Sequence, residues 1–212
     1  PTVGSVLRSM WERGWSFIKR AGTVIVASSV VLWFLQGFGF VDGAFGMVED
    51  NNSSLLATIG GAICWIFAPL GWGDWQATVA AVTGLVAKEN IVATMGILYG
   101  GDNGVYANLA AAFTGVAGMS FLIFNLLCAP CFAAMGAIKR EMNNAKWFWF
   151  AVGYECGFAY AVSLVVYQLG ELFSGNANIL GTIVAFALVA FMIYMLVRPY
   201  KESNTLRTKV RV

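Results

Sequence analysis

The chain has 212 residues, of which 59% are hydrophobic and only 11% are charged. A soluble domain usually carries about 25% charged residues, so this composition excludes an ordinary soluble protein. The net charge of +2 gives no indication of a nucleic-acid partner. Several apolar runs approach the roughly 20 residues that a helix needs to cross a bilayer. We therefore predict an all-α polytopic transmembrane helical bundle that contacts the lipid bilayer.

The first predicted element is an amphipathic helix at the membrane surface. Residues 1–21 mix basic side chains, tryptophans and apolar residues at helical spacing, which is typical of an interfacial helix. Residues 22–40 carry no charge and predict a first span. Residues 53–70 are shorter and stop near Pro69, so they predict either a second span or half of a re-entrant hairpin.

Longer apolar runs follow toward the C-terminus. The predicted segments are 75–98, 106–127 with a continuation to 138 after a break, 147–169 and 178–197. The first of them holds Lys88 and Glu89 about 20 Å from its start, near the middle of a bilayer. Residues 54–98 therefore predict either two crossings or a hairpin that folds back.

The basic residues indicate the orientation of the chain. Of the 13 Lys and Arg, four precede residue 22, three lie within 139–146, five follow residue 197, and the remaining one is Lys88. By the positive-inside rule, both termini and the 139–146 loop are cytoplasmic. We expect a membrane domain over residues 22–197 with about six membrane segments, and a basic cytoplasmic tail over residues 198–212.

A cysteine pair interrupts one of the apolar helices, in the run Cys128-Ala129-Pro130-Cys131. Proline has no backbone N–H and its ring collides with the preceding turn, so carbonyl groups just upstream lose their intrahelical partners. Irregular backbone at membrane depth is tolerated where it lines a cavity or is buried in protein. Pro130 therefore predicts a broken helix between Cys128 and Pro130.

Three interpretations fit the two cysteines. They can be buried structural thiols, a thiol–disulfide pair of the C-x-x-C type, or soft ligands for a metal together with freed carbonyls and Asn125. Cys131 lies about 12 Å before Lys139, hence between the membrane middle and the cytoplasmic face. A redox site for exported proteins would lie near the opposite face, so the position favours the metal interpretation.

Further side chains qualify as ligands. Charges inside a membrane are functional by default, so Glu89 is a candidate ligand or proton acceptor and Lys88 its counter-charge. Each can instead pair with a neighbouring helix. Glu155, about 13 Å into its helix, predicts a cavity contact or a hydrogen bond inside the bundle. Met135 offers a thioether one turn beyond the second cysteine, although methionine in apolar helices is usually filler.

Three stretches resemble the ferrous iron transport protein B (FeoB) family. They are TGLVAKENIVATMGILYG (83–100), NLLCAPCFAAMGAIKREM (125–142) and WERGWSFIKRAGTVI (11–25). The resemblance implies the C-terminal half of the permease with a nucleoside-transporter-like gate, in the bacterial cytoplasmic (inner) membrane. It implies Fe²⁺ as the transported substrate, no permanently bound cofactor, and Cys128, Cys131 and Pro130 as gate residues.

The resemblance also implies partners outside these residues. They are an N-terminal GTPase and the first gate half of the parent protein, besides a homo-oligomer. The 212 residues contain no G-x-x-x-x-G-K-[ST] phosphate loop, so we expect a transporter fragment that neither binds GTP nor acts as an enzyme. The alternatives are a membrane thiol–disulfide oxidoreductase using Cys128 and Cys131, or a non-catalytic membrane assembly subunit.

Overall fold

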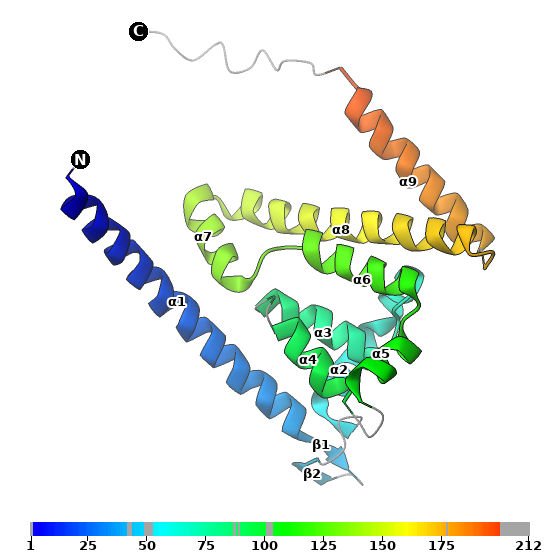
Figure 1. Cartoon of the computed structure of the whole chain (residues 1–212), viewed down its shortest axis with the longest axis horizontal. Coiled ribbons are helices and arrows are strands. Elements are labelled where there is room, and N and C mark those ends of the chain that lie inside the picture. The colour runs from blue at the N-terminus through cyan, green and yellow to red at the C-terminus, as the bar shows by residue number, and fades with distance from the viewer. Residues whose placement is uncertain are drawn as a thin grey trace.

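The computed structural model describes residues 2–41, 44–48, 53–86, 88, 90–100, 104–176 and 178–199. These residues form a helical assembly with one short β-hairpin (Figure 1). The helices are α1 (Val3–Gly37), α2 (Leu55–Ile63), α3 (Trp75–Val86), α4 (Asn90–Leu98), α5 (Val105–Ala112), α6 (Gly115–Leu127), α7 (Phe132–Met142), α8 (Ala145–Phe173) and α9 (Ile179–Val197). The short elements are the strands β1 (Phe38–Val41) and β2 (Ala44–Met47) and the 3₁₀ turns η2 (Cys64–Ile66) and η3 (Ala68–Leu70).

The prediction of a helical membrane protein is confirmed. By length and composition, α8 and α9 can each cross a membrane, and α5 with α6, bent by 98°, is either a broken third span or a re-entrant loop. This count covers only the described ranges. The structure adds the β-hairpin, which the sequence did not predict.

Helix α1 joins two segments that the sequence predicts separately. It runs for 35 residues without a break at residues 21 and 22. The β-hairpin follows, with Phe38 paired to Met47. Gly39 is required there, because a Cβ atom would collide with the carbonyl oxygen of Ser53. Helix α1 otherwise stands apart, touching α2 and α7 (Figure 1).

The chain reverses direction after α2. Ser54 caps the start of α2 by accepting a hydrogen bond from the backbone N–H of Ala57 at 3.0 Å. The 3₁₀ turns then lead to Gly71, whose φ of 89° favours glycine. We call residues 64–74 the Pro69 turn. Helix α3 returns beside α2, an arrangement that two crossings and a folded-back hairpin have in common.

The prediction of one continuous helix over residues 75–98 is wrong. Helices α3 and α4 form a hairpin, in which Thr83 Oγ1 donates to Thr94 Oγ1 at 3.2 Å. The Tyr99 hydroxyl donates to the Asp74 carboxylate and so ties the end of α4 to the start of α3. Lys88 therefore lies in the connection between α3 and α4 and not inside one continuous helix.

The predicted helix over residues 106–127 is also two helices. The joint lies at Phe113 and Thr114, and the Thr114 hydroxyl caps α6 by accepting from the N–H of Ala117 at 3.2 Å. The Phe113 ring packs on Tyr99 and Phe121, with ring centroids 5.9 Å and 5.6 Å away. Capping and aromatic packing therefore favour the bend over a straight helix.

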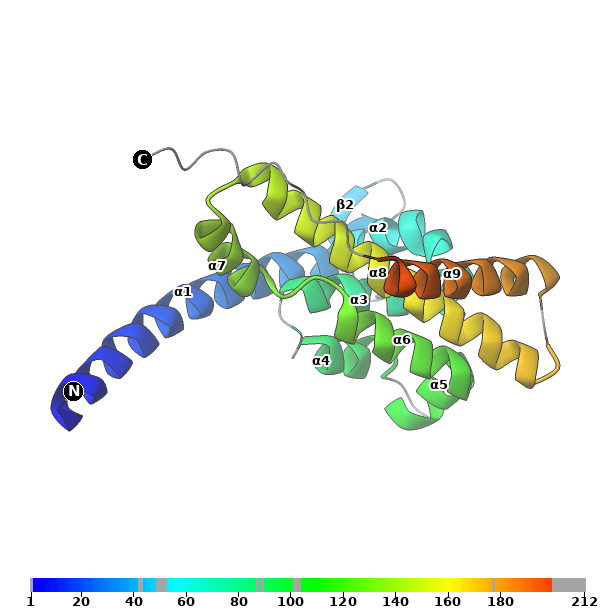
Figure 2. The same cartoon turned by 90° about the horizontal axis from the view of Figure 1, so that it is seen from above.

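The core lies between α3, α6, α8 and the Pro69 turn. Helices α6 and α8 run side by side (Figures 1 and 2). The fully buried Ser120 and Ser163 lie where they meet, with their hydroxyl oxygens 2.7 Å apart. Small polar residues let membrane helices approach closely and bond across the interface. The buried hydrophobic cluster is Leu70, Trp72, Ala77, Ala80, Ala81, Phe121, Leu164 and Ala185.

Candidate functional site at the broken helix

The predicted break at Pro130 is confirmed. Helix α6 ends at Leu127, α7 begins at Phe132, and the residues between them are extended, with ψ of 167° at Cys128 and 159° at Cys131. A proline disfavours the helical conformation in the residue before it, which explains why the helix stops here. We call residues 128–131 the Cys128 break.

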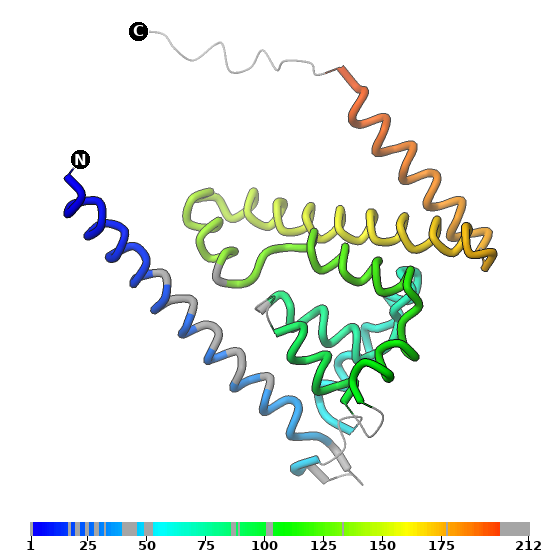
Figure 3. The backbone as a smooth tube through the Cα atoms, in the orientation of Figure 1, coloured from blue at the N-terminus to red at the C-terminus, as the bar shows by residue number. Residues whose placement is uncertain are grey.

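Lys88 closes the end of α6. Its Nζ donates to the carbonyl oxygens of Asn125 at 2.8 Å, Leu126 at 3.2 Å and Cys128 at 3.5 Å. The α3–α4 hairpin extends toward the α6–α7 connection (Figure 3). The last carbonyls of a helix have no intrahelical partner and form the negative end of its dipole, so an ammonium group is stabilised there.

Asn125 lies beside these carbonyls and is 6% exposed. Its Nδ2 donates to the carbonyl oxygen of Phe121 at 2.8 Å. Its Oδ1 is buried and has no hydrogen-bond partner among the described residues. This oxygen faces α3, because a Cβ atom on Gly84 would lie 3.4 Å from it. Gly84 and Lys88 belong to the same α3–α4 hairpin, so Oδ1 faces the hairpin that carries the lysine.

The cysteines at the break are free thiols. Cys128 is buried and Cys131 is half-buried. The Cys128 thiol lies 3.9 Å from the carbonyl oxygen of Asn125, and Lys88 bonds the carbonyl oxygens of both residues. The structure thus brings the predicted candidates Cys128, Asn125 and Lys88 together, whereas Glu155 lies on α8.

The other predicted ligands are less closely placed. Met135 is half-buried at the end of the first turn of α7, and its backbone N–H donates to the carbonyl oxygen of Cys131 at 2.9 Å. Glu89 lies outside the described residues. Within the described part of the chain, no three Cys, Asp or Glu side chains converge as a metal site.

A second set of donors, which the sequence did not predict, lies at the Pro69 turn. The Tyr160 hydroxyl donates to the carbonyl oxygen of Ile66 at 2.7 Å and Gln168 Nε2 to that of Pro69 at 2.8 Å. The Ser120 hydroxyl donates to the carbonyl oxygen of Leu70 at 2.8 Å. Isolated polar residues in apolar helices were the available signal, because such groups need partners inside a membrane.

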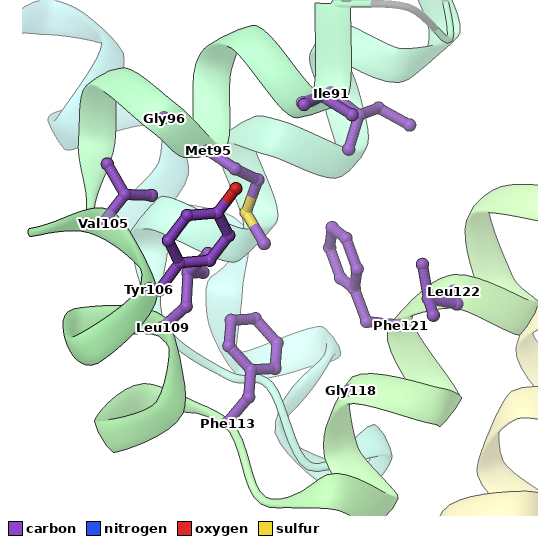
Figure 4. Close-up of a pocket in the computed structure, with 11 residues that line it drawn as sticks. Ile91, Met95, Gly96, Val105, Tyr106, Leu109, Phe113, Gly118, Phe121 and Leu122 are labelled. Atoms are coloured by element: carbon purple, nitrogen blue, oxygen red, sulfur yellow. The ribbon is translucent and has the colours of Figure 1, made fainter. Parts of the chain in front are cut away.

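An apolar cavity of about 560 Å³ lies between α4, α5 and α6. Figure 4 shows aliphatic and aromatic side chains around it, with the hydroxyl of Tyr106 as the oxygen drawn among them. Its lining comprises Ile91, Val92, Met95, Gly96, Val105, Tyr106, Leu109, Phe113, Gly118, Phe121 and Leu122. Such walls cannot replace the hydration shell of an ion. The Cys128 break, with its oxygen and sulfur atoms, is therefore the better candidate site for a cation.

Comparison with known proteins gives one family. The family described as Gate, nucleoside recognition, matches residues 18–145. The Fe(2+) transporter FeoB of Staphylococcus aureus is 37% identical over 174 residues, which cover 82% of this chain and 26% of the relative. FeoB of Methanocaldococcus jannaschii is 38% identical over 178 residues (81% and 26%). FeoB of Salmonella typhimurium is 29% identical over 224 residues (80% and 28%). The chain thus spans about a quarter of each relative, and no solved structure matches.

Proposed function

Because the chain belongs to the Gate family, as the gate region of FeoB membrane proteins, we propose that it forms part of a path for Fe²⁺ across the bacterial cytoplasmic membrane. The Cys128 break supports this proposal most directly. It gathers carbonyl oxygens, a buried amide oxygen and two thiols at the point where an apolar helix stops.

In this proposal the break replaces the hydration of Fe²⁺ as the ion passes. The thiols of Cys128 and Cys131 and the oxygens at Asn125 supply soft and hard ligands, and Glu89, Glu155 and Met135 are further candidate ligands. Sulfur favours Fe²⁺ over Mg²⁺ and Ca²⁺. Affinity alone would prefer copper or zinc, so selection against those metals has to come from geometry and metal availability.

Each relative is about four times as long as the stretch that matches this chain. This length supports an ion path that includes further segments besides these residues. We expect a GTPase and a first gate half as partners in the complete transporter, and a homo-oligomer as a further candidate assembly. Cytoplasmic positions for both termini and for the 139–146 loop remain predictions from the charge pattern.

The burial of Cys128 counts against the thiol oxidoreductase alternative. Thiol–disulfide exchange needs an accessible thiolate, whereas the Cys128 side chain is 6% exposed. No contact in the described residues specifically favours a purely structural assembly subunit.

The test replaces Cys128 and Cys131 by serine, singly and together, in the complete gene product that carries this chain. We expect the initial rate of ⁵⁵Fe²⁺ uptake into proteoliposomes to fall about tenfold, because each serine removes a soft ligand. The matched control is Cys64→Ser, since Cys64 donates locally to the carbonyl oxygen of Gly61, away from the break. Unchanged uptake, with a mixed disulfide trapped at either cysteine, would contradict the proposal.

A further inference from the structure

The carbonyl oxygens at the end of α6 bind one cation of the same chain, the ammonium group of Lys88. Lys88 Nζ lies 2.8, 3.2 and 3.5 Å from three backbone oxygens that belong to consecutive or nearly consecutive residues, Asn125, Leu126 and Cys128. Carbonyl oxygens at the negative end of a helix dipole also suit a metal cation. Broken helices in membrane transporters coordinate ions with such carbonyls.

The lysine does not complete the site. An ammonium group has three N–H donors, and here three carbonyl oxygens accept from it. Asn125 Oδ1 is left without a partner among the described residues, although the side chain is 94% buried. A buried acceptor without a donor is costly. A divalent cation takes six or more oxygen ligands, so it could use the oxygen that the lysine leaves unpaired.

We propose that Lys88 is the tethered occupant of a divalent-cation site made by the carbonyl oxygens of Asn125, Leu126 and Cys128 and by Asn125 Oδ1. The ammonium and the cation exclude each other, because both need the same oxygens and two positive charges a few ångströms apart repel strongly. The inference rests on the proposed function at one point only: that function identifies the natural cation of this site as the transported Fe²⁺.

The position of Lys88 suits an exchange. It lies at the tip of the α3–α4 hairpin, its side chain is half-buried, and its flexible four-carbon stem lets the ammonium group withdraw without unfolding a helix. A monovalent ion carries the same charge as the ammonium group it would displace, whereas a divalent ion gains twice the attraction to the carbonyls. Lys88 is therefore a specificity-determining residue that favours divalent over monovalent cations.

The first experiment measures Mn²⁺ binding, because Mn²⁺ is a divalent cation with an electron paramagnetic resonance signal when free. It uses the complete gene product in lipid nanodiscs without nucleotide. Lys88→Met keeps the apolar stem and removes the competitor, so we expect the Kd for Mn²⁺ to fall by about tenfold or more. The control is Lys139→Met on the exposed side of α7, which should leave the Kd unchanged. Unchanged or weaker Mn²⁺ binding by folded Lys88→Met would overturn the inference.

The second experiment needs no variant and covers the case in which Lys88→Met does not fold. The wild-type protein is acetylated by an amine-reactive reagent at rising Mn²⁺ concentration, and each lysine is read by mass spectrometry. Displacement predicts about threefold faster acetylation at Lys88 when Mn²⁺ saturates the site, with Lys139 and Lys146 unchanged. Acetylation of Lys88 that is independent of Mn²⁺ would overturn the inference.

The two proposals fail separately. If the wild-type protein transports no Fe²⁺ while Lys88→Met still tightens Mn²⁺ binding, the transport proposal fails and the cation site stands. If the wild-type protein takes up Fe²⁺ while Lys88→Met leaves the Kd for Mn²⁺ unchanged, the site proposed here fails and the transport proposal stands.

Discussion

The Pro69 turn and the Cys128 break both end an apolar helix and leave carbonyl oxygens without intrahelical partners, but different groups satisfy them. At the Pro69 turn the donors are neutral: the hydroxyls of Tyr160 and Ser120 and the amide of Gln168, at 2.7–2.8 Å. At the Cys128 break the donor is the ammonium of Lys88. A neutral hydroxyl or amide donor is not replaced by a cation, because it carries no charge and is fixed to a packed helix. The ammonium group of Lys88, by contrast, occupies a position among carbonyl oxygens that another cation can bind.

Both regions hold buried residues, since Cys128 and Ala129 of the break are 6% and 1% exposed. The aromatic core, however, lies at the Pro69 turn, and the more exposed side chains include the lysine at the break. Leu70 and Trp72 of the Pro69 turn are 0% and 2% exposed, and the Trp72 ring stacks on Phe67 with centroids 4.5 Å apart. Around the Cys128 break, Lys88 and Cys131 are half-exposed. We infer that the first region is a fixed part of the fold, and that the second can change its occupant while the first stays in place.

The largest effect is expected from Trp72→Ala. This change empties the centre of the core, and truncating a buried tryptophan costs about 3–5 kcal/mol. We expect about 3 kcal/mol, because lipid around the unfolded helices lowers the gain from burying apolar surface. The measurement is the free energy of unfolding in mixed micelles titrated with SDS.

The control for that prediction is Trp65→Ala, the same substitution in the same turn. Trp65 is 69% exposed, and its Nε1 donates locally to the carbonyl oxygen of Ala62. We expect a loss below about 1 kcal/mol. Equal losses for the two variants would show that the Pro69 turn is not the packed region the structure describes.

A smaller loss is expected from Ser120→Ala. It removes the donor to the carbonyl oxygen of Leu70 and leaves that buried group unpaired, which costs about 1–3 kcal/mol. Mn²⁺ affinity should not change, because Ser120 lies at the Pro69 turn and not at the cation site. The control is Ser174→Ala, whose hydroxyl makes an exposed bond to Gly170 at 3.0 Å. A change in Mn²⁺ affinity for Ser120→Ala would contradict the division between the two regions.

The two breaks also differ in how far sequence could predict them. Pro130 could be identified because its effect is covalent and local: a missing N–H and a ring that collides with the preceding turn. The bend at Thr114 had a local signal as well, a threonine before glycine that could serve as an N-cap, but the apolar run around it favoured one long helix.

The α3–α4 turn had no comparable local cause. Its tip is held by bonds from Lys88 to residues 37 to 40 positions later in the chain. The sequence therefore identified Lys88, Asn125 and Cys128 as functional candidates but placed the lysine in mid-span. The donors at the Pro69 turn were equally hidden, since Gln168 lies 99 residues from its partner Pro69.

The smallest effect is expected from Asn125→Leu, and its matched control is Gln168→Leu, which also removes a buried amide. Asn125→Leu removes both the Nδ2 bond to the carbonyl oxygen of Phe121 and a buried acceptor, Oδ1, that has no partner among the described residues. These two effects oppose each other, so stability should change by less than about 1 kcal/mol. Gln168→Leu leaves the carbonyl oxygen of Pro69 unpaired and should cost about 1–3 kcal/mol. Mn²⁺ affinity should follow the opposite order, falling for Asn125→Leu and not for Gln168→Leu. Equal stability losses would mean that Asn125 Oδ1 is satisfied in the folded protein, and the cation site would lose its fourth oxygen.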